Sequence, residues 1–131
     1  MIFTVLLSLL RNIIMEKYKS YIGKRLNPDH PEIYDIFESD NGFTVVCFIQ
    51  TRNLNNEQAL ENGTLVIGGC CGCGLPVVVR VDINADKDYN ILSVETSAKA
   101  EFPLGFGKPI PLDLNEHDET EISTLLDILT A

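Results

Sequence analysis

The sequence is short of basic residues. Its 131 residues include 10 Lys and Arg against 19 Asp and Glu, so the formal net charge is −9. Residues 1–30 hold 5 basic and 2 acidic residues (local charge +3), and the rest hold 5 basic and 17 acidic ones (local charge −12). Because such a surface repels phosphates, we expect no nucleic-acid and no membrane partner. It suits a basic protein, whose association it would steer, although solubility alone is a competing explanation.

Cysteine is scarce too, with four in the chain, which excludes a disulfide scaffold. The apolar start, "MIFTVLLSLLRNIIMEKY", lacks the leading positive charge and small-residue cleavage site of an export signal, and it is too short to span a bilayer. Its polar residues recur at helical spacing, which predicts an amphipathic helix packed inward, with a membrane-surface helix as the alternative. We therefore expect a reduced, cytoplasmic protein.

Catalytic motifs are missing. The chain has no G-x-S-x-G and no H-E-x-x-H, and "GFGKP" at 105–109 lacks the spacing of a phosphate loop. The pairs Asp35 with Glu38 and Asp86 with Asp88 have the chemistry for acid–base work, but such pairs more often form a solvated face. Nothing assembles a nucleophile, a base and an oxyanion donor. We expect a protein that is not an enzyme, with no catalytic residue and no cofactor.

The richest local pattern is "GTLVIGGCCGCGLPVVV" at 63–79, which holds Cys70, Cys71 and Cys73. Zinc normally requires four ligands, and the chain offers no second C-x-x-C to complete a site. A redox C-x-x-C stands at a helix N-terminus, whereas glycines, a proline and a β-rich run follow here. A metal or redox site stays an alternative, but we favour small buried thiols beside a tight turn and expect no metal.

Hydrophobic periodicity divides the chain into helices, then strands, then a helix. Helices are predicted over 3–21 and 31–39, a helical turn over 55–63, strands over 43–50, 64–67, 76–82 and 91–96, a polar hairpin loop over 84–90 and an irregular connection over 101–111. A C-terminal helix follows Asn115, a candidate N-cap with Asp118 three residues on. Its inward face holds Ile122, Leu125, Leu126 and Leu129. We predict one α+β domain over 1–131: an antiparallel β-sheet meander with N-terminal helices and a C-terminal helix packed on it.

Two segments in order resemble the SUKH superfamily, the fold of the fungal cell-wall-synthesis regulators and of many bacterial toxin-immunity proteins. The first segment is "HPEIYDIFESDNG", with matching positions Pro31, Tyr34, Phe37, Asn41 and Gly42. The second is "EQALENGTLVIGGCCGCGLPVVVRVD", with matching positions Gly63, Leu65, Ile67, Gly68, Gly72, Cys73 and Gly74. The resemblance covers about residues 31–82. The doublet Cys70–Cys71, the pair Leu75–Pro76 and the apolar first helix depart from the family pattern.

The resemblance implies a non-enzymatic immunity protein that binds and neutralises a cognate toxin, often a nuclease or a nucleic-acid deaminase. Such toxins are basic because they bind phosphate backbones, so an acidic inhibitor suits the task. As partner-binding residues we expect exposed acids around the predicted second helix and the strand loops: Asp35, Glu38, Asp40, Asp86 and Asp88. The alternatives are a regulatory adaptor of the same fold and a metal- or redox-active protein using the cysteine cluster.

Overall fold

The computed structural model describes residues 17–54, 75–100 and 109–131. Within these ranges the chain forms a short 3₁₀ helix η1 (Lys19–Tyr21), five strands β1 (Asp35–Ser39), β2 (Gly42–Leu54), β3 (Leu75–Asp86), β4 (Ile91–Ala100) and β5 (Ile110–Leu112), and helix α3 (Glu116–Leu129). The strands form one sheet in the order β1-β2-β3-β4-β5. Every neighbouring pair is antiparallel, so the predicted meander is confirmed.

The predicted helix over 31–39 is wrong, because Asp35–Ser39 is an edge strand. Strand β1 pairs with β2 from Asp35 opposite Val46 to Ser39 opposite Gly42, across a two-residue turn at Asp40 and Asn41. The backbone hydrogen bonds of this pairing stabilise a strand here more than the helical spacing of the apolar residues stabilises a helix. Gly42 is required here, since a Cβ atom on it would lie 2.1 Å from the Ala85 carbonyl oxygen of β3.

Several other predicted elements agree with the structure in whole or in part. The strands at 43–50, 76–82 and 91–96 are confirmed and run longer than predicted, which shortens the hairpin loop to 87–90. Part of the predicted irregular connection is strand β5. Of the predicted first helix, only the end is described, where η1 precedes Gly23 at φ 88°. The predicted turn over 55–63, the strand over 64–67 and the three clustered cysteines lie outside the described residues.

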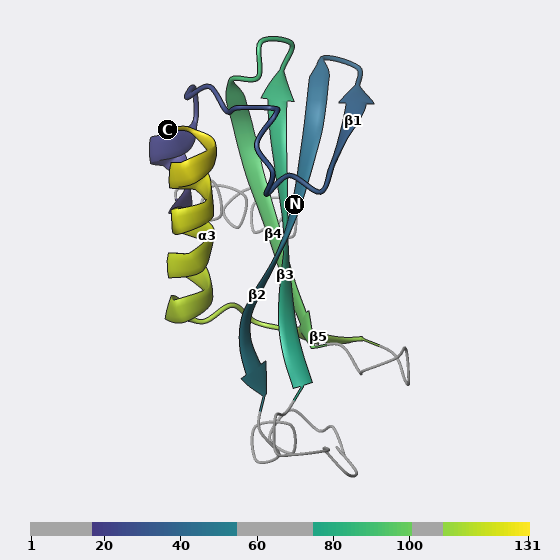
Figure 1. Cartoon of the computed structure of the whole chain (residues 1–131), viewed down its shortest axis with the longest axis vertical. Coiled ribbons are helices and arrows are strands. Elements are labelled where there is room, and N and C mark those ends of the chain that lie inside the picture. Colours follow the sequence, from purple (N-terminus) through teal and green to yellow (C-terminus); the bar gives the residue numbers. More distant parts are fainter. Residues whose placement is uncertain (1–16, 55–74, 101–108) are drawn as a thin grey trace, which may run out of the picture.

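The inner face of the sheet carries the core. Along β3 the side chains of Leu75, Val77, Val79, Val81, Ile83 and Ala85 are buried, and every second residue between them is more exposed. This period of two matches a strand with one covered face. Helix α3 covers that face (Figure 1), with Ile122, Leu125, Leu126 and Leu129 buried against it as the sequence predicts. The coarse α+β architecture is therefore confirmed.

The segment from Tyr21 to Asn27 links α3 to the β3–β4 hairpin. The Tyr21 hydroxyl donates to the Asp127 carboxylate at 2.7 Å, and the Asn27 N–H donates to the Leu129 carbonyl at 2.8 Å. On the other side, the Gly23 and Leu26 N–H groups donate to the carbonyls of Ile91 and Tyr89 at 2.8 and 2.9 Å. None of the described helices has the length and hydropathy that a membrane-spanning segment requires.

Candidate functional site

The predicted binding residues fall into two places. Asp40 lies in the β1–β2 turn, Asp86 ends β3, and Asp88 lies in the following turn. Because Gly42 stands opposite Asp86, these two turns share one end of the sheet, where the two hairpins turn side by side (Figure 1). Glu38 lies within β1, near the end of the strand that leads into the turn. Asp35 lies at the opposite end of β1, farther from the two turns. We call Glu38, Asp40, Asp86 and Asp88 the hairpin-end acids.

Asp86 holds the β3–β4 turn together. Its carboxylate accepts the N–H groups of Asp88 and Asn90, both at 2.9 Å, and the Asn90 side-chain amide at 3.1 Å. The Asn90 backbone N–H is the largest cause that lowers the pKa of Asp86, with further lowering from the Asn90 amide and the Asp88 N–H. Tyr89, in this turn at φ 65°, stacks on Phe43 with ring centroids 4.6 Å apart. Asp86 is therefore a structural residue of the turn.

The other hairpin-end acids have no such structural role. Glu38, Asp40 and Asp88 are exposed, and their carboxylates form no ion pair with any described residue. Asp35 is exposed too, but one of its oxygens accepts the Ile36 N–H at 2.8 Å. A partner's basic groups would therefore reach three of the five predicted carboxylates without displacing an existing contact.

The outer face of the sheet, opposite α3, carries acids that the sequence reasoning missed. We use this name for the three rows of that face nearest to β1, whose residues alternate with the core positions: Asp35, Phe37, Thr44, Val46, Phe48, Arg80, Asp82, Asn84, Ser93, Glu95 and Ser97. Asp35 lies opposite Val46, Val46 opposite Asp82, and Asp82 opposite Glu95. One row across four strands thus holds three carboxylates. Only the register of the strands brings them together, so no local signal in the sequence marks them.

Aromatic rings adjoin this row. The Tyr34 ring meets the Phe48 ring edge to face, with centroids 4.9 Å apart, and Tyr34 is 73% exposed. Arg80, opposite Phe48, places its guanidinium carbon 5.8 Å from the Phe48 ring centre and its Nε 3.0 and 3.2 Å from the two Asp82 oxygens. The outer face therefore combines negative charge with an accessible aromatic surface.

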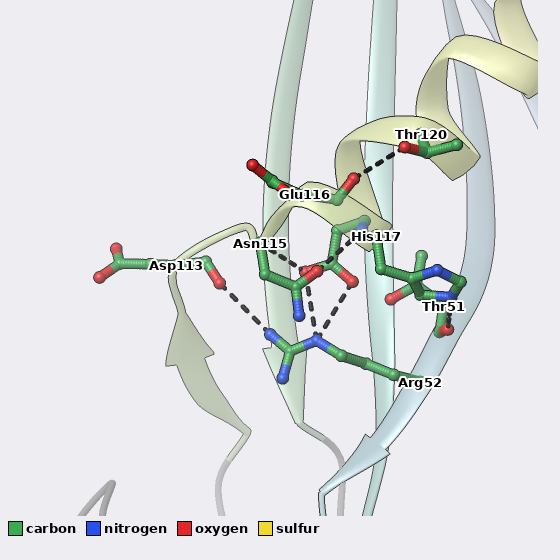
Figure 2. Close-up of polar contacts among 8 residues, drawn as sticks. Thr51, Arg52, Asp113, Asn115, Glu116, His117 and Thr120 are labelled. Carbon is green, nitrogen blue, oxygen red and sulfur yellow. Dashed lines mark hydrogen bonds and ion pairs between the residues drawn. The ribbon is translucent and has the colours of Figure 1, made fainter.

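A third polar cluster joins β2 to the start of α3 (Figure 2). Arg52 Nε donates to both oxygens of Asp118 at 3.2 and 3.3 Å, and an Arg52 NH2 group donates to the Asp113 carbonyl at 3.4 Å. The Asn115 side chain accepts the Asp118 N–H, and the Asp118 carboxylate accepts the Asn115 N–H, which completes a capping box. The predicted N-cap is confirmed.

Asp118 is fully buried, which shapes its ionisation. Burial by itself raises the pKa of this carboxyl, but the Asn115 N–H and the Arg52 guanidinium favour the charged form, and the pKa is lowered overall. The Arg52–Asp118 pair links α3 to β2, and the Asn115–Asp118 hydrogen bonds stabilise the start of the helix. We therefore assign the cluster to stability and not to partner binding.

The described thiol and imidazole groups are engaged elsewhere. Cys47 is buried in the core, and burial raises the pKa of its thiol to about 11. His117 Nε2 donates to the Thr51 carbonyl at 2.9 Å, and His30 Nδ1 accepts the Glu32 N–H at 3.1 Å. Among residues 17–54, 75–100 and 109–131, no group of three or more His, Cys, Asp or Glu is placed to hold a metal ion.

No family model, curated protein or solved structure matches this chain.

The lowered pKa values predict a loss of stability in acid. A carboxyl whose folded-state pKa lies below its unfolded value adds stability above the unfolded pKa, about 3.9, and this stability is lost as the pH falls through the folded pKa. We expect the urea midpoint to fall as the pH is lowered from about 5 towards 2. We also expect the side-chain carboxyl carbons of Asp86 and Asp118 to titrate below about 3.9 in NMR spectra. Midpoints at or above that value would contradict the assigned hydrogen bonds.

Proposed function

We propose that the chain is a non-enzymatic binding protein of the immunity type, which neutralises a cognate basic, nuclease-type toxin through its acidic surface. The observation that carries the proposal is the set of exposed carboxylates of Glu38, Asp40 and Asp88 at one end of the sheet, on a chain of net charge −9. Opposite charge on two partners speeds their encounter and fixes their orientation. The two-segment resemblance to the SUKH superfamily supports the toxin as the partner.

The finer features belong to the same proposal. A SUKH-like fold would place the predicted first helix, over 3–21, against the sheet, and an inhibitor of an intracellular nuclease would act in the cytoplasm. The antiparallel meander and the C-terminal helix are compatible with this fold. Stoichiometric binding requires no cofactor.

The first experiment captures the partner and tests its toxicity. The tagged full chain is used at low salt in an extract of its native organism, and stoichiometric co-purifying proteins are identified by mass spectrometry. We expect a basic protein that arrests growth when it is expressed alone and no longer does so when it is co-expressed with this chain. A captured partner without toxicity would support the regulatory adaptor instead, and an acidic partner would contradict the electrostatic proposal.

Charge-matched variants then locate the surface. The triple variant Glu38→Gln, Asp40→Asn, Asp88→Asn removes three exposed charges and spares Asp86, which holds its turn. We expect its affinity for the captured partner to fall at least about tenfold at low salt, because three exposed ion pairs are lost. The control variant Asp113→Asn, Glu116→Gln, Glu121→Gln removes the same charge from exposed positions around the start of α3. Equal losses in both variants would show that net charge alone matters.

A further inference from the structure

We infer that the binding surface extends from Asp35 across the outer face of the sheet, and that this face takes an arginine side chain of the partner on the ring of Tyr34. The inference rests on the proposed function, since it concerns the same basic partner. It adds a second recognition element, which selects arginine over lysine.

The first support is the exposure of Tyr34. Tyr34 is 73% exposed, so most of the surface of this residue is available to a partner. The residue is nevertheless held in place, because its backbone N–H donates to the Val46 carbonyl at 2.9 Å and its ring contacts Phe48 edge to face. A fixed aromatic ring loses little conformational entropy when a partner binds it.

The second support is the way the outer face already holds an arginine of its own. The Arg80 guanidinium lies beside the Phe48 ring and within 3.2 Å of both Asp82 oxygens, so an aromatic ring and a carboxylate share one arginine. Tyr34 adds a second ring beside Phe48, Asp35 adds a carboxylate to the row of Asp82, and no described arginine pairs with either of them. Guanidinium groups stack on rings and pair with carboxylates better than ammonium groups do.

The third support is the charge of the row. Asp82 is paired with Arg80, which leaves Asp35 and Glu95 as the uncompensated carboxylates of the row among the described residues. A cation on Tyr34 would lie in the combined field of Asp35, Glu95 and the hairpin-end acids. Charge complementarity therefore selects a basic protein segment as the occupant of this face.

Blocked hexaarginine and hexalysine peptides, titrated at low salt into the ¹⁵N-labelled full chain, test the inference. We expect the largest amide shifts for hexaarginine at Tyr34, Asp35 and Phe48. We expect Tyr34→Leu to weaken hexaarginine binding about two- to fivefold and hexalysine binding less, because leucine keeps apolar bulk but removes the ring. Tyr34→Phe keeps the ring and should bind hexaarginine like the wild-type chain.

Phe37→Leu is the matched control, since Phe37 is 52% exposed on the same face and has no ring contact with a described residue. We expect it to leave both affinities unchanged. Unchanged hexaarginine affinity in Tyr34→Leu, or shifts confined to α3, overturns the inference. Shifts confined to the hairpin-end acids overturn it too, while the proposed function stands. If the wild-type chain binds neither peptide at low salt, the inference and the electrostatic proposal both fail.

Discussion

Asp118→Ala is expected to lower the free energy of unfolding by about 3–5 kcal/mol, the usual cost of removing one partner from a buried ion pair. Asp118 is fully buried, and its loss leaves the Asn115 N–H without its acceptor and Arg52 without its carboxylate. Total stabilities of small domains are about 5–15 kcal/mol, so this loss is a large fraction of the total. Urea denaturation followed by circular dichroism measures the loss.

Asp113→Ala is the control for this experiment, because Asp113 is exposed and belongs to the same segment. Its side chain should matter by no more than about 0.5 kcal/mol, since Arg52 contacts only its backbone carbonyl. An Asp118→Ala variant as stable as Asp113→Ala would mean that the Arg52–Asp118 pair does not hold α3 on the sheet.

Ile122→Ala is expected to lower the free energy of unfolding by about 2–5 kcal/mol, through lost burial and the cavity left behind. Ile122 is 0% exposed in the interface between α3 and the inner face of the sheet. The same substitution at Ile128 is the control, because Ile128 is 42% exposed on the same helix. Ile128→Ala should change stability by less than about 1 kcal/mol, since alanine has the highest helix propensity. Similar losses at both positions would contradict the packing of α3 described above.

Parts of the fold follow from local sequence. In β3 the strict alternation of buried and more exposed positions reflects one covered face, and its β-branched residues predict the strand correctly. The C-terminal helix is predicted from its cap and its apolar stripe, and the capping box at Asn115 and Asp118 agrees with that prediction. In both cases short-range chemistry and tertiary structure favour the same element.

Strand β1 shows where local reasoning fails. Ile33, Tyr34 and Phe37 recur at a spacing that fits a helix, and Pro31 precedes them as it would at a helix N-terminus. The structure instead pairs Asp35 with Val46 and Phe37 with Thr44, in a hairpin with β2. Hydrogen bonds to a neighbouring strand override a weak helix propensity. The hydrophobic period of one segment carries no information about its pairing with another strand.

The candidate site is predictable only in part, for the same reason. Glu38, Asp40 and Asp88 were predicted as exposed acids and are exposed, but Asp86 is tied to its turn by three hydrogen bonds. Asp82 and Glu95 join Asp35 in one row through strand register, which is a non-local property. Sequence alone therefore identifies the sign of the surface charge better than its arrangement.

We propose that this chain binds a basic partner through the acids at the hairpin ends of the sheet. The most direct test measures the affinity of the captured partner for the wild-type chain and the two charge-matched triple variants over a range of salt concentrations. We predict that Glu38→Gln, Asp40→Asn, Asp88→Asn weakens binding at least about tenfold at low salt and flattens its salt dependence, whereas the α3 control keeps both. Wild-type affinity and salt dependence in the hairpin-end variant would contradict the claim.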